Sequence, residues 1–383
     1  MTVDGEKIMA SKKYIDENTA TNIWAKARAE RIPIHGSLEL TRRCNVRCPY
    51  CYLDFAHNTR PEDELSREEL FSILDQIVSE GCLSLTFTGG EPLSREDFKP
   101  LYLYAIRKGL MVIIFTNGTL IDREMADFFA LYPPFYIDIT VFGATEETYE
   151  RVSGIKGTFR QCREAIKLLA ERDIPFGLKS VITTLNQQEI GEMKNWAKGL
   201  GQEFRFDTMI CPQLNGSRSG IKYRLSPEEI VQLDHQDPEK WQEWLDYACR
   251  QKTPVHSDRL YSCGGGLTSF HITSSGKLGL CVLDTNHHYD LIEGSFHEGW
   301  YSFIPRVRDI RIEKESECSN CRFRDICTIC PAWSMIETGS PEKIVDFICQ
   351  IAHLRGILLK EYRGSKNEEE KKETISQARS KGR

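Results

Sequence analysis

At residues 36–51 the chain reads GSLELTRRCNVRCPYC. The short apolar run over residues 38–40 predicts a strand, and Cys44, Cys48 and Cys51 follow it directly. Three thiols this close together on one loop can bind a single metal centre. The stretch therefore predicts a metal site at the carboxyl end of the first strand.

Beyond this stretch, short apolar strands alternate with amphipathic helices. One helix is predicted after Ser66, because Ser66 and Glu69 form a capping-box pattern before apolar residues at three-to-four spacing. Such alternation is typical of a parallel sheet with helices outside it. The predicted fold class is α/β, a partial (β/α)6 TIM-like barrel whose active-site residues follow the strands. The predicted strands cover residues 38–40, 84–88, 111–116, 135–141, 177–183 and 203–209, and further helices lie near residues 95–108, 122–130, 159–171 and 187–200.

Changes in composition suggest the boundaries of further parts. Cysteines become frequent and periodicity fades towards the C-terminus, as expected for a domain held by metal rather than by a large apolar core. The last twenty residues alternate Lys, Glu and Ser and predict a charged tail. The predicted parts are an N-terminal extension (1–33), the barrel core (34–214), linker helices (215–254), a C-terminal cysteine-rich iron–sulfur domain (255–350), and a C-terminal helix with the tail (351–383).

The chain has 383 residues, 14 cysteines and a formal net charge of −6. An acidic chain gives no reason to expect nucleic acid or an anionic membrane as partner. No stretch is apolar and long enough for a signal peptide or a membrane span, so a reducing cytoplasm is the expected location. Because thiols stay reduced there, the cysteines are expected to bind metal rather than to form disulfides.

The first cysteine group fits an iron–sulfur cluster better than zinc. A structural zinc site needs four ligands, and His57 is the only nearby candidate for the fourth. A cluster held by three thiolates keeps one iron open for a cofactor or substrate. A zinc loop is the alternative interpretation.

The spacing CxxxCxxC, with Tyr50 before the last cysteine, resembles the signature of the radical S-adenosylmethionine (SAM) superfamily. After the second predicted strand, residues 88–93 read TGGEPL and are similar to the GGEP segment of that family. By itself, a Gly-Gly-Glu-Pro sequence also fits a plain strand-to-helix turn with Pro at the helix start. The resemblance implies an enzyme in which a [4Fe-4S] cluster and SAM together generate a 5′-deoxyadenosyl radical.

The resemblance also implies which residues hold the cofactors. Relatives often have Ser-x-Asp-Gly where this chain has Thr140, and Phe142 replaces the Asp. Residues 116–118 fit a plain turn as well as a site. The residues implied are Cys44, Cys48 and Cys51 for the cluster; Gly89, Gly90 and Glu91 for the methionine amino group; Tyr50 near the adenine; Thr140 for the ribose; and Ser180 or Lys179 as further SAM contacts.

Seven more cysteines follow in the C-terminal part of the chain. CxxC knuckles suit zinc as well as iron–sulfur clusters, so a pair of structural zinc sites is one interpretation. Their order resembles the SPASM extension of radical SAM enzymes, which houses two auxiliary [4Fe-4S] clusters and would bring the total to three. The resemblance assigns Cys263, Cys281 and Cys330 to auxiliary cluster I, and Cys318, Cys321, Cys327 and Cys349 to auxiliary cluster II.

Auxiliary cluster I departs from the fullest SPASM pattern. That pattern has another cysteine a few residues before Cys263, where this chain reads DRLYS at residues 258–262. Cluster I therefore either keeps an open iron or uses the more distant Cys249. Three other cysteines fit small buried apolar residues without a ligand role, namely Cys82, Cys162 and Cys211.

The resemblance implies the reaction class more closely than the substrate. Members with auxiliary clusters commonly modify ribosomally made peptides or proteins by cross-linking, oxidation or epimerisation, so a peptide or protein is the expected substrate. The segment before the first strand is too short for a fused leader-binding domain, so a separate recognition protein or direct binding is expected. The expected electron donor is a flavodoxin or a ferredoxin.

Two other functions fit the same sequence. A radical SAM enzyme can oxidise a small cofactor precursor such as a tetrapyrrole. The cysteines alone also fit a non-catalytic iron–sulfur electron carrier, although a carrier has no use for a methionine-binding segment. Candidates for an acid or base are Asp207, Arg205, Arg218 and Tyr261, and the sequence singles out none of them, so no catalytic residue is assigned.

Overall fold

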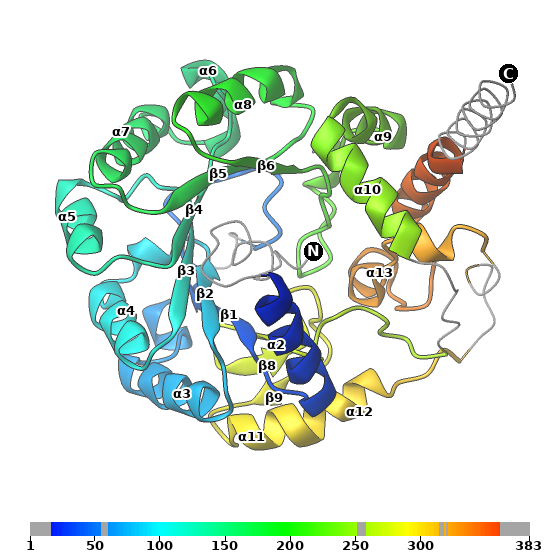
Figure 1. The fold of residues 1–383 in the computed structure, drawn as a ribbon, viewed down its shortest axis with the longest axis horizontal. Helices are drawn as coiled ribbons and strands as arrows, with labels where there is room; N and C mark the ends of the chain where they lie inside the picture. The colour runs from blue at the N-terminus through cyan, green and yellow to red at the C-terminus, as the bar shows by residue number, and fades with distance from the viewer. Residues whose placement is uncertain (1–16, 55–59, 251–257, 314–317, 319–320, 361–383) are drawn as a thin grey trace, which may run out of the picture. The chain divides into compact units, whose positions relative to one another are not determined.

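The structure is a computed structural model that describes residues 17–54, 60–250, 258–313, 318 and 321–360 (Figure 1). The chain forms two compact units. The barrel unit comprises Met1–Arg224 and Tyr261–Ile310, and the helical unit comprises Leu225–Leu260 and Arg311–Arg383. None of the described helices is long and apolar enough to cross a membrane.

The barrel unit is built on one sheet with the strand order β6-β5-β4-β3-β2-β1-β7-β8-β9. In this order, every neighbouring pair from β6 through to β7 is parallel. Strand β8 pairs antiparallel with both β7 and β9. The first six strands and their helices confirm the predicted α/β partial barrel. The strands are β1 (His35–Thr41), β2 (Ser84–Gly89), β3 (Met111–Thr116), β4 (Tyr136–Thr140), β5 (Phe176–Val181), β6 (Phe204–Asp207), β7 (Ser269–Ile272), β8 (Lys277–Gly279) and β9 (Tyr289–Asp290).

Helices α3 to α8 surround these strands on the outside (Figure 1). The predicted capping box at the start of α3 is present, since Ser66 accepts from the amide of Glu69 and Glu69 accepts from the amide of Ser66. The helices of this unit are α2 (Glu17–Glu30), α3 (Arg67–Ser79), α4 (Phe98–Arg107), α5 (Arg123–Leu131), α6 (Glu146–Ser153), α7 (Thr158–Ala170), α8 (Ile190–Gly199), α11 (Phe296–Glu298) and α12 (Ile304–Arg308), with a π-helical turn at Gly299–Phe303.

Side chains alternate between the two faces of the strands. On the outer face, Phe87 packs edge-on against Phe98 of α4, and apolar side chains fill the layer under the helices. On the inner face, Asp138 of β4 is fully buried and pairs with Lys179 of β5 and Arg205 of β6. The inner face therefore carries buried charged groups among its side chains.

The compact units differ from the predicted domain boundaries. Residues 261–310, predicted to belong to a separate cysteine-rich domain, are part of the barrel unit. The reason is β7, which pairs in parallel with β1 and extends the barrel sheet. The described part of the predicted N-terminal extension contains helix α2.

The helices predicted to form a linker between two domains belong instead to the helical unit. Three apolar residues of α10 pack in one core with residues of the cysteine-rich segment, because they lie on one face of the helix. This unit therefore has an apolar core besides its cysteines. The core residues are Trp241, Leu245, Ala248, Phe323, Ile326 and Leu359. The helices are α9 (Pro227–Gln236), α10 (Pro238–Arg250), α13 (Pro331–Thr338) and residues 346–360, and the predicted tail (364–383) lies outside the described residues.

Candidate functional site

The three-cysteine loop, residues 44–51, leaves the carboxyl end of β1 and packs against the end of α6. The amide of Arg47 donates to the carbonyl oxygen of Ser153 at 2.7 Å. A Cβ atom added to Gly154 would lie only 2.8 Å from the carbonyl oxygen of Arg47, and Gly154 has a φ of +72°. Only glycine allows both this backbone conformation and this approach, so the end of α6 holds the loop in place.

The three thiols of the loop are largely shielded from water. Burial raises the pKa of Cys44 to about 11 and that of Cys51 to about 12, and burial raises the pKa of Cys48 well above its usual value. The thiols are therefore neutral until a metal displaces their protons. Among the described residues, no three Cys, His, Asp or Glu side chains converge as ligands of a single metal ion do. The cluster predicted on these three thiols stays a prediction.

Tyr50, predicted to lie near the adenine of SAM, is buried within the same loop. Its hydroxyl has no hydrogen-bond partner among the described residues. The backbone beside it is tightly packed, because a Cβ atom added to Gly220 would lie 3.0 Å from the Cα of Tyr50. The predicted contact with adenine stays a prediction.

Gly89 and Gly90 bring the end of β2 against the start of the three-cysteine loop. The amide of Gly90 donates to the carbonyl oxygen of Thr41 at 2.8 Å. A Cβ atom added to Gly89, whose φ is +125°, would lie 2.1 Å from that oxygen. A Cβ atom added to Gly90 would lie 2.3 Å from the carbonyl oxygen of Arg43. The two glycines thus have a structural role in addition to their predicted contact with SAM.

Glu91 links the ends of β2 and β3. It is fully buried, and its carboxylate accepts hydrogen bonds from Leu93 N (3.1 Å), Thr116 Oγ1 (2.8 Å) and Asn117 N (2.8 Å). Burial raises its pKa from 4.5 to about 7. Since three donors of the chain occupy the carboxylate, its predicted contact with the methionine amino group stays a prediction.

Asn117 extends this link to the cysteine loop, a role that the sequence did not reveal. Its side-chain amide lies 3.9 Å from Cys44 Sγ and 2.9 Å from Asn45 Oδ1, to which it donates. Asn45 in turn donates to Thr119 Oγ1 at 2.7 Å. The only signal in the sequence is position, because Asn117 follows the third strand directly at the edge where active sites lie.

Thr140 and Ser180, both predicted to contact SAM, lie on different faces of the sheet. Thr140 pairs in register with Lys179, whose ammonium lies 3.3 Å from the inner-face carboxylate of Asp138. Ser180 follows Lys179 and therefore points to the helix layer, where it is 3% exposed. The predicted contacts of Thr140, Lys179 and Ser180 with SAM stay predictions.

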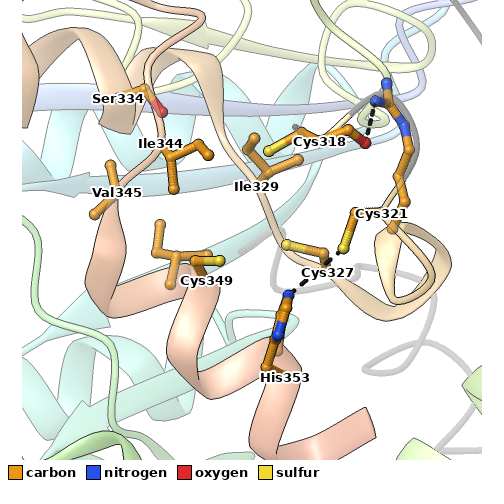
Figure 2. Close-up of a pocket in the computed structure, with 12 residues that line it drawn as sticks. Cys318, Cys321, Cys327, Ile329, Ser334, Ile344, Val345, Cys349 and His353 are labelled. Atoms are coloured by element: carbon orange, nitrogen blue, oxygen red, sulfur yellow. Dashed lines mark hydrogen bonds between the residues drawn. The ribbon is translucent and has the colours of Figure 1, made fainter. Parts of the chain in front are cut away.

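A second group of thiols lines a pocket in the helical unit (Figure 2). Burial raises the pKa of Cys327 to about 11, and the nearby thiols of Cys318, Cys349 and Cys321 add to the rise. Cys321 donates its amide to the carbonyl oxygen of Cys318 at 3.4 Å, as in a CxxC turn. The structure thus brings together all four residues predicted for auxiliary cluster II. Five apolar side chains and three polar ones complete the wall, namely Ile329, Ile344, Val345, Ile348, Ala352, Arg324, Ser334 and His353.

The residues predicted for auxiliary cluster I are divided between the two units. Cys263 and Cys281 belong to the barrel unit, whereas Cys330, at the start of α13, and Cys249 belong to the helical unit. Arg308 supports the turn at Cys263, because its guanidinium donates to the carbonyl oxygen of Cys263 at 2.9 Å. This cluster stays a prediction.

The remaining candidates have ordinary surroundings. Cys82 and Cys162 are buried, as expected of small apolar residues. Phe142, which replaces the acid of the Ser-x-Asp-Gly pattern, packs edge-on against Tyr149. Of the predicted acid and base candidates, Tyr261 lies with its hydroxyl 3.2 Å from His287 Nδ1.

Comparison with known proteins identifies the family. The sequence profile of the Radical SAM superfamily matches residues 38–198. The PqqA peptide cyclase of Bradyrhizobium diazoefficiens is 30% identical over 310 residues, which cover 77% of this chain and 80% of that protein. The AdoMet-dependent heme synthase of Methanosarcina barkeri is 26% identical over 322 residues, covering 79% of this chain and 92% of that protein. The chain belongs to the radical SAM superfamily.

A solved structure has the same fold. The crystal structure of SuiB from Streptococcus suis, bound to its precursor peptide SuiA, aligns with a TM-score of 0.66 at 19% identity, covering 87% of this chain and 80% of that chain. Members of the superfamily use SAM and one [4Fe-4S] cluster. When bound, that cluster supplies the electron that splits SAM into methionine and a 5′-deoxyadenosyl radical.

Proposed function

We propose that this radical SAM enzyme modifies a ribosomally made peptide or protein by oxidation, cross-linking or epimerisation. The observation that carries the proposal is the pocket lined by Cys318, Cys321, Cys327 and Cys349. A chain that only cleaves SAM needs the three-cysteine loop alone, whereas a second, half-buried set of four thiols suits an auxiliary cluster that handles a further electron.

In this proposal the barrel unit binds SAM. Cys44, Cys48 and Cys51 hold the first cluster, and the backbone at residues 89–90 lies beside them to receive the methionine end. Thr140 contacts the ribose from the inner face. Glu91 acts mainly through Asn117, which holds the cysteine loop from the side.

The auxiliary site completes the electron balance of an oxidation. Transfer of one hydrogen atom from the substrate to the deoxyadenosyl radical leaves a substrate radical. An oxidised product then requires the loss of one more electron and one proton. Cys318, Cys321, Cys327 and Cys349 would hold a cluster that could accept this electron, while a flavodoxin or ferredoxin would be the electron donor for SAM cleavage. Cys263, Cys281 and Cys330 hold a second auxiliary cluster in this SPASM arrangement.

Two similarities bear on the substrate. The 30% identity to a PqqA peptide cyclase supports a peptide. A tetrapyrrole is the second candidate, because the similarity to an AdoMet-dependent heme synthase extends over 92% of that protein.

The test is a paired substrate assay. Anaerobically purified protein with SAM and dithionite is given short peptides encoded beside its gene and, separately, Fe-coproporphyrin III. We expect a peptide product that lacks two hydrogens or is cross-linked or epimerised, with 5′-deoxyadenosine formed in step. Conversion of the tetrapyrrole alone would replace the peptide proposal with the second candidate.

A further inference from the structure

His353 lies in the four-cysteine pocket beside one of its thiols. Residues 346–360 form a helix, and Cys349 and His353 are four positions apart on it, so both point to the same side. Figure 2 shows both side chains in the pocket. His353 Nε2 lies 3.6 Å from Cys321 Sγ, which is within reach of a hydrogen bond to sulfur.

The imidazole ring is held on its other side by the core of the helical unit. It packs edge-on against Phe323, with ring centroids 5.0 Å apart and planes at 67°. Phe323 is itself 3% exposed. The helix that carries His353 lies close to this ring, because a Cβ atom added to Gly356 would lie 2.3 Å from Phe323. His353 itself is exposed, and its contact with Phe323 is what supports the ring beside Cys321.

We propose that His353 is a positioning residue that donates its Nε2–H to the sulfur of Cys321 and raises the reduction potential of the auxiliary cluster. The proposal rests on the proposed function, since it assumes a cluster on the four thiols. A hydrogen bond to a ligand sulfur withdraws negative charge and so favours the reduced, more negative state of the cluster.

The donor role predicts which substitutions matter. His353→Phe keeps a planar ring of similar size but removes the donor, whereas His353→Gln keeps an N–H group. His235 provides a matched control, because it is an exposed histidine of the same unit that packs against Trp241 and does not line the pocket.

The experiment uses the full chain with Cys44, Cys48, Cys51, Cys263 and Cys281 replaced by Ala, so that the iron that remains belongs to the four-cysteine pocket. Iron and sulfide content are measured first, and the midpoint potential of the auxiliary signal then follows from a redox titration read by electron paramagnetic resonance. We expect His353→Phe to change the ratio of reduced to oxidised cluster about fivefold at a fixed potential, a fall of about 40 mV for one electron. His353→Gln and His235→Gln should stay within a few millivolts of the parent.

Three outcomes would overturn the inference in different ways. An unchanged potential in His353→Phe with full iron content would show that the histidine does not act on the cluster. Loss of iron in His353→Phe would make His353 a ligand or a structural residue instead of a donor. Absence of iron from the parent in which these five cysteines are replaced by Ala would contradict the cluster in the four-cysteine pocket, and the inference with it.

Discussion

The backbone amide of Asn117 donates a hydrogen bond to the carboxylate of Glu91 at 2.8 Å. The side chain of the same asparagine lies 3.9 Å from Cys44 Sγ. The acid of the Gly-Gly-Glu-Pro segment is therefore linked through one residue to the first cysteine of the metal-binding loop. These contacts give Glu91 a role in supporting that loop, beside the contact with SAM that is predicted for it.

Replacement of Glu91 by Ala should destabilise the protein by about 2–3 kcal/mol, because the buried amide of Asn117 loses its acceptor. Less iron should be retained by the three-cysteine loop. Urea unfolding and iron analysis measure the two effects. Glu96→Ala is the control, since Glu96 is an exposed acid in the same segment. Equal stability and iron content in both variants would contradict this role.

Gly90→Ala should also weaken the cysteine loop, because its Cβ atom would lie 2.3 Å from the backbone oxygen of Arg43. We expect a lower unfolding midpoint and reduced SAM cleavage. Gly191→Ala is the matched control, as a Cβ atom there meets nothing within 4 Å. Helix α8 should be stabilised by about 0.5–1 kcal/mol in that variant. Wild-type stability of Gly90→Ala would show that the loop adjusts freely.

Asp234 and Arg355 form a buried ion pair in the helical unit, with Arg355 Nε 3.2 Å from Asp234 Oδ2. Arg355 also lies 3.7 Å from the centre of the Trp244 ring. Asp234→Ala should destabilise the protein by about 3 kcal/mol, because it leaves a buried guanidinium unpaired. Asp246→Ala, at an exposed acid of α10, should change thermal unfolding little. A similar small effect for Asp234→Ala would contradict the prediction.

Acid should destabilise the fold partly through His35. Burial lowers the pKa of His35 from 6.5 to about 4, and its Nδ1 lies 2.8 Å from Ser84 Oγ. Between these two pH values the unfolded state binds the extra proton, so stability is highest above pH 6.5 and falls as the pH drops towards 4.

The check is urea unfolding at pH 7.5 and pH 5. On going from pH 7.5 to pH 5, His35→Gln should lose less stability than the parent does. The control variant His297→Gln, at an exposed histidine, should lose as much as the parent. An identical pH dependence in His35→Gln and the parent would rule out the contribution of His35.

The local patterns of the sequence predicted much of the barrel unit. Alternating strands and helices gave the fold class, and the cap at Ser66 marked the start of α3. Strand β7 was missed because it has only four residues and owes its place to pairing with β1. The core around Trp241 could have been predicted from the sequence, since the apolar residues of α10 repeat at helical spacing.

The candidate site was predicted where residues are close in sequence. The three-cysteine loop and the four thiols of the pocket follow from spacing and resemblance. Asn117 and His353 were missed because their roles depend on contacts across distant segments. The face of the sheet on which Ser180 lies is likewise evident only from the register of Lys179 with Thr140.

The most direct test of the radical SAM mechanism is iron and sulfide content together with 5′-deoxyadenosine release. It compares the anaerobically purified parent with the Cys44/Cys48/Cys51→Ala variant, both given dithionite and SAM. We predict three clusters' worth of iron and deoxyadenosine release in the parent, and the loss of one cluster and all cleavage in the variant. Zinc in place of iron, or cleavage that survives in the variant, would contradict the account.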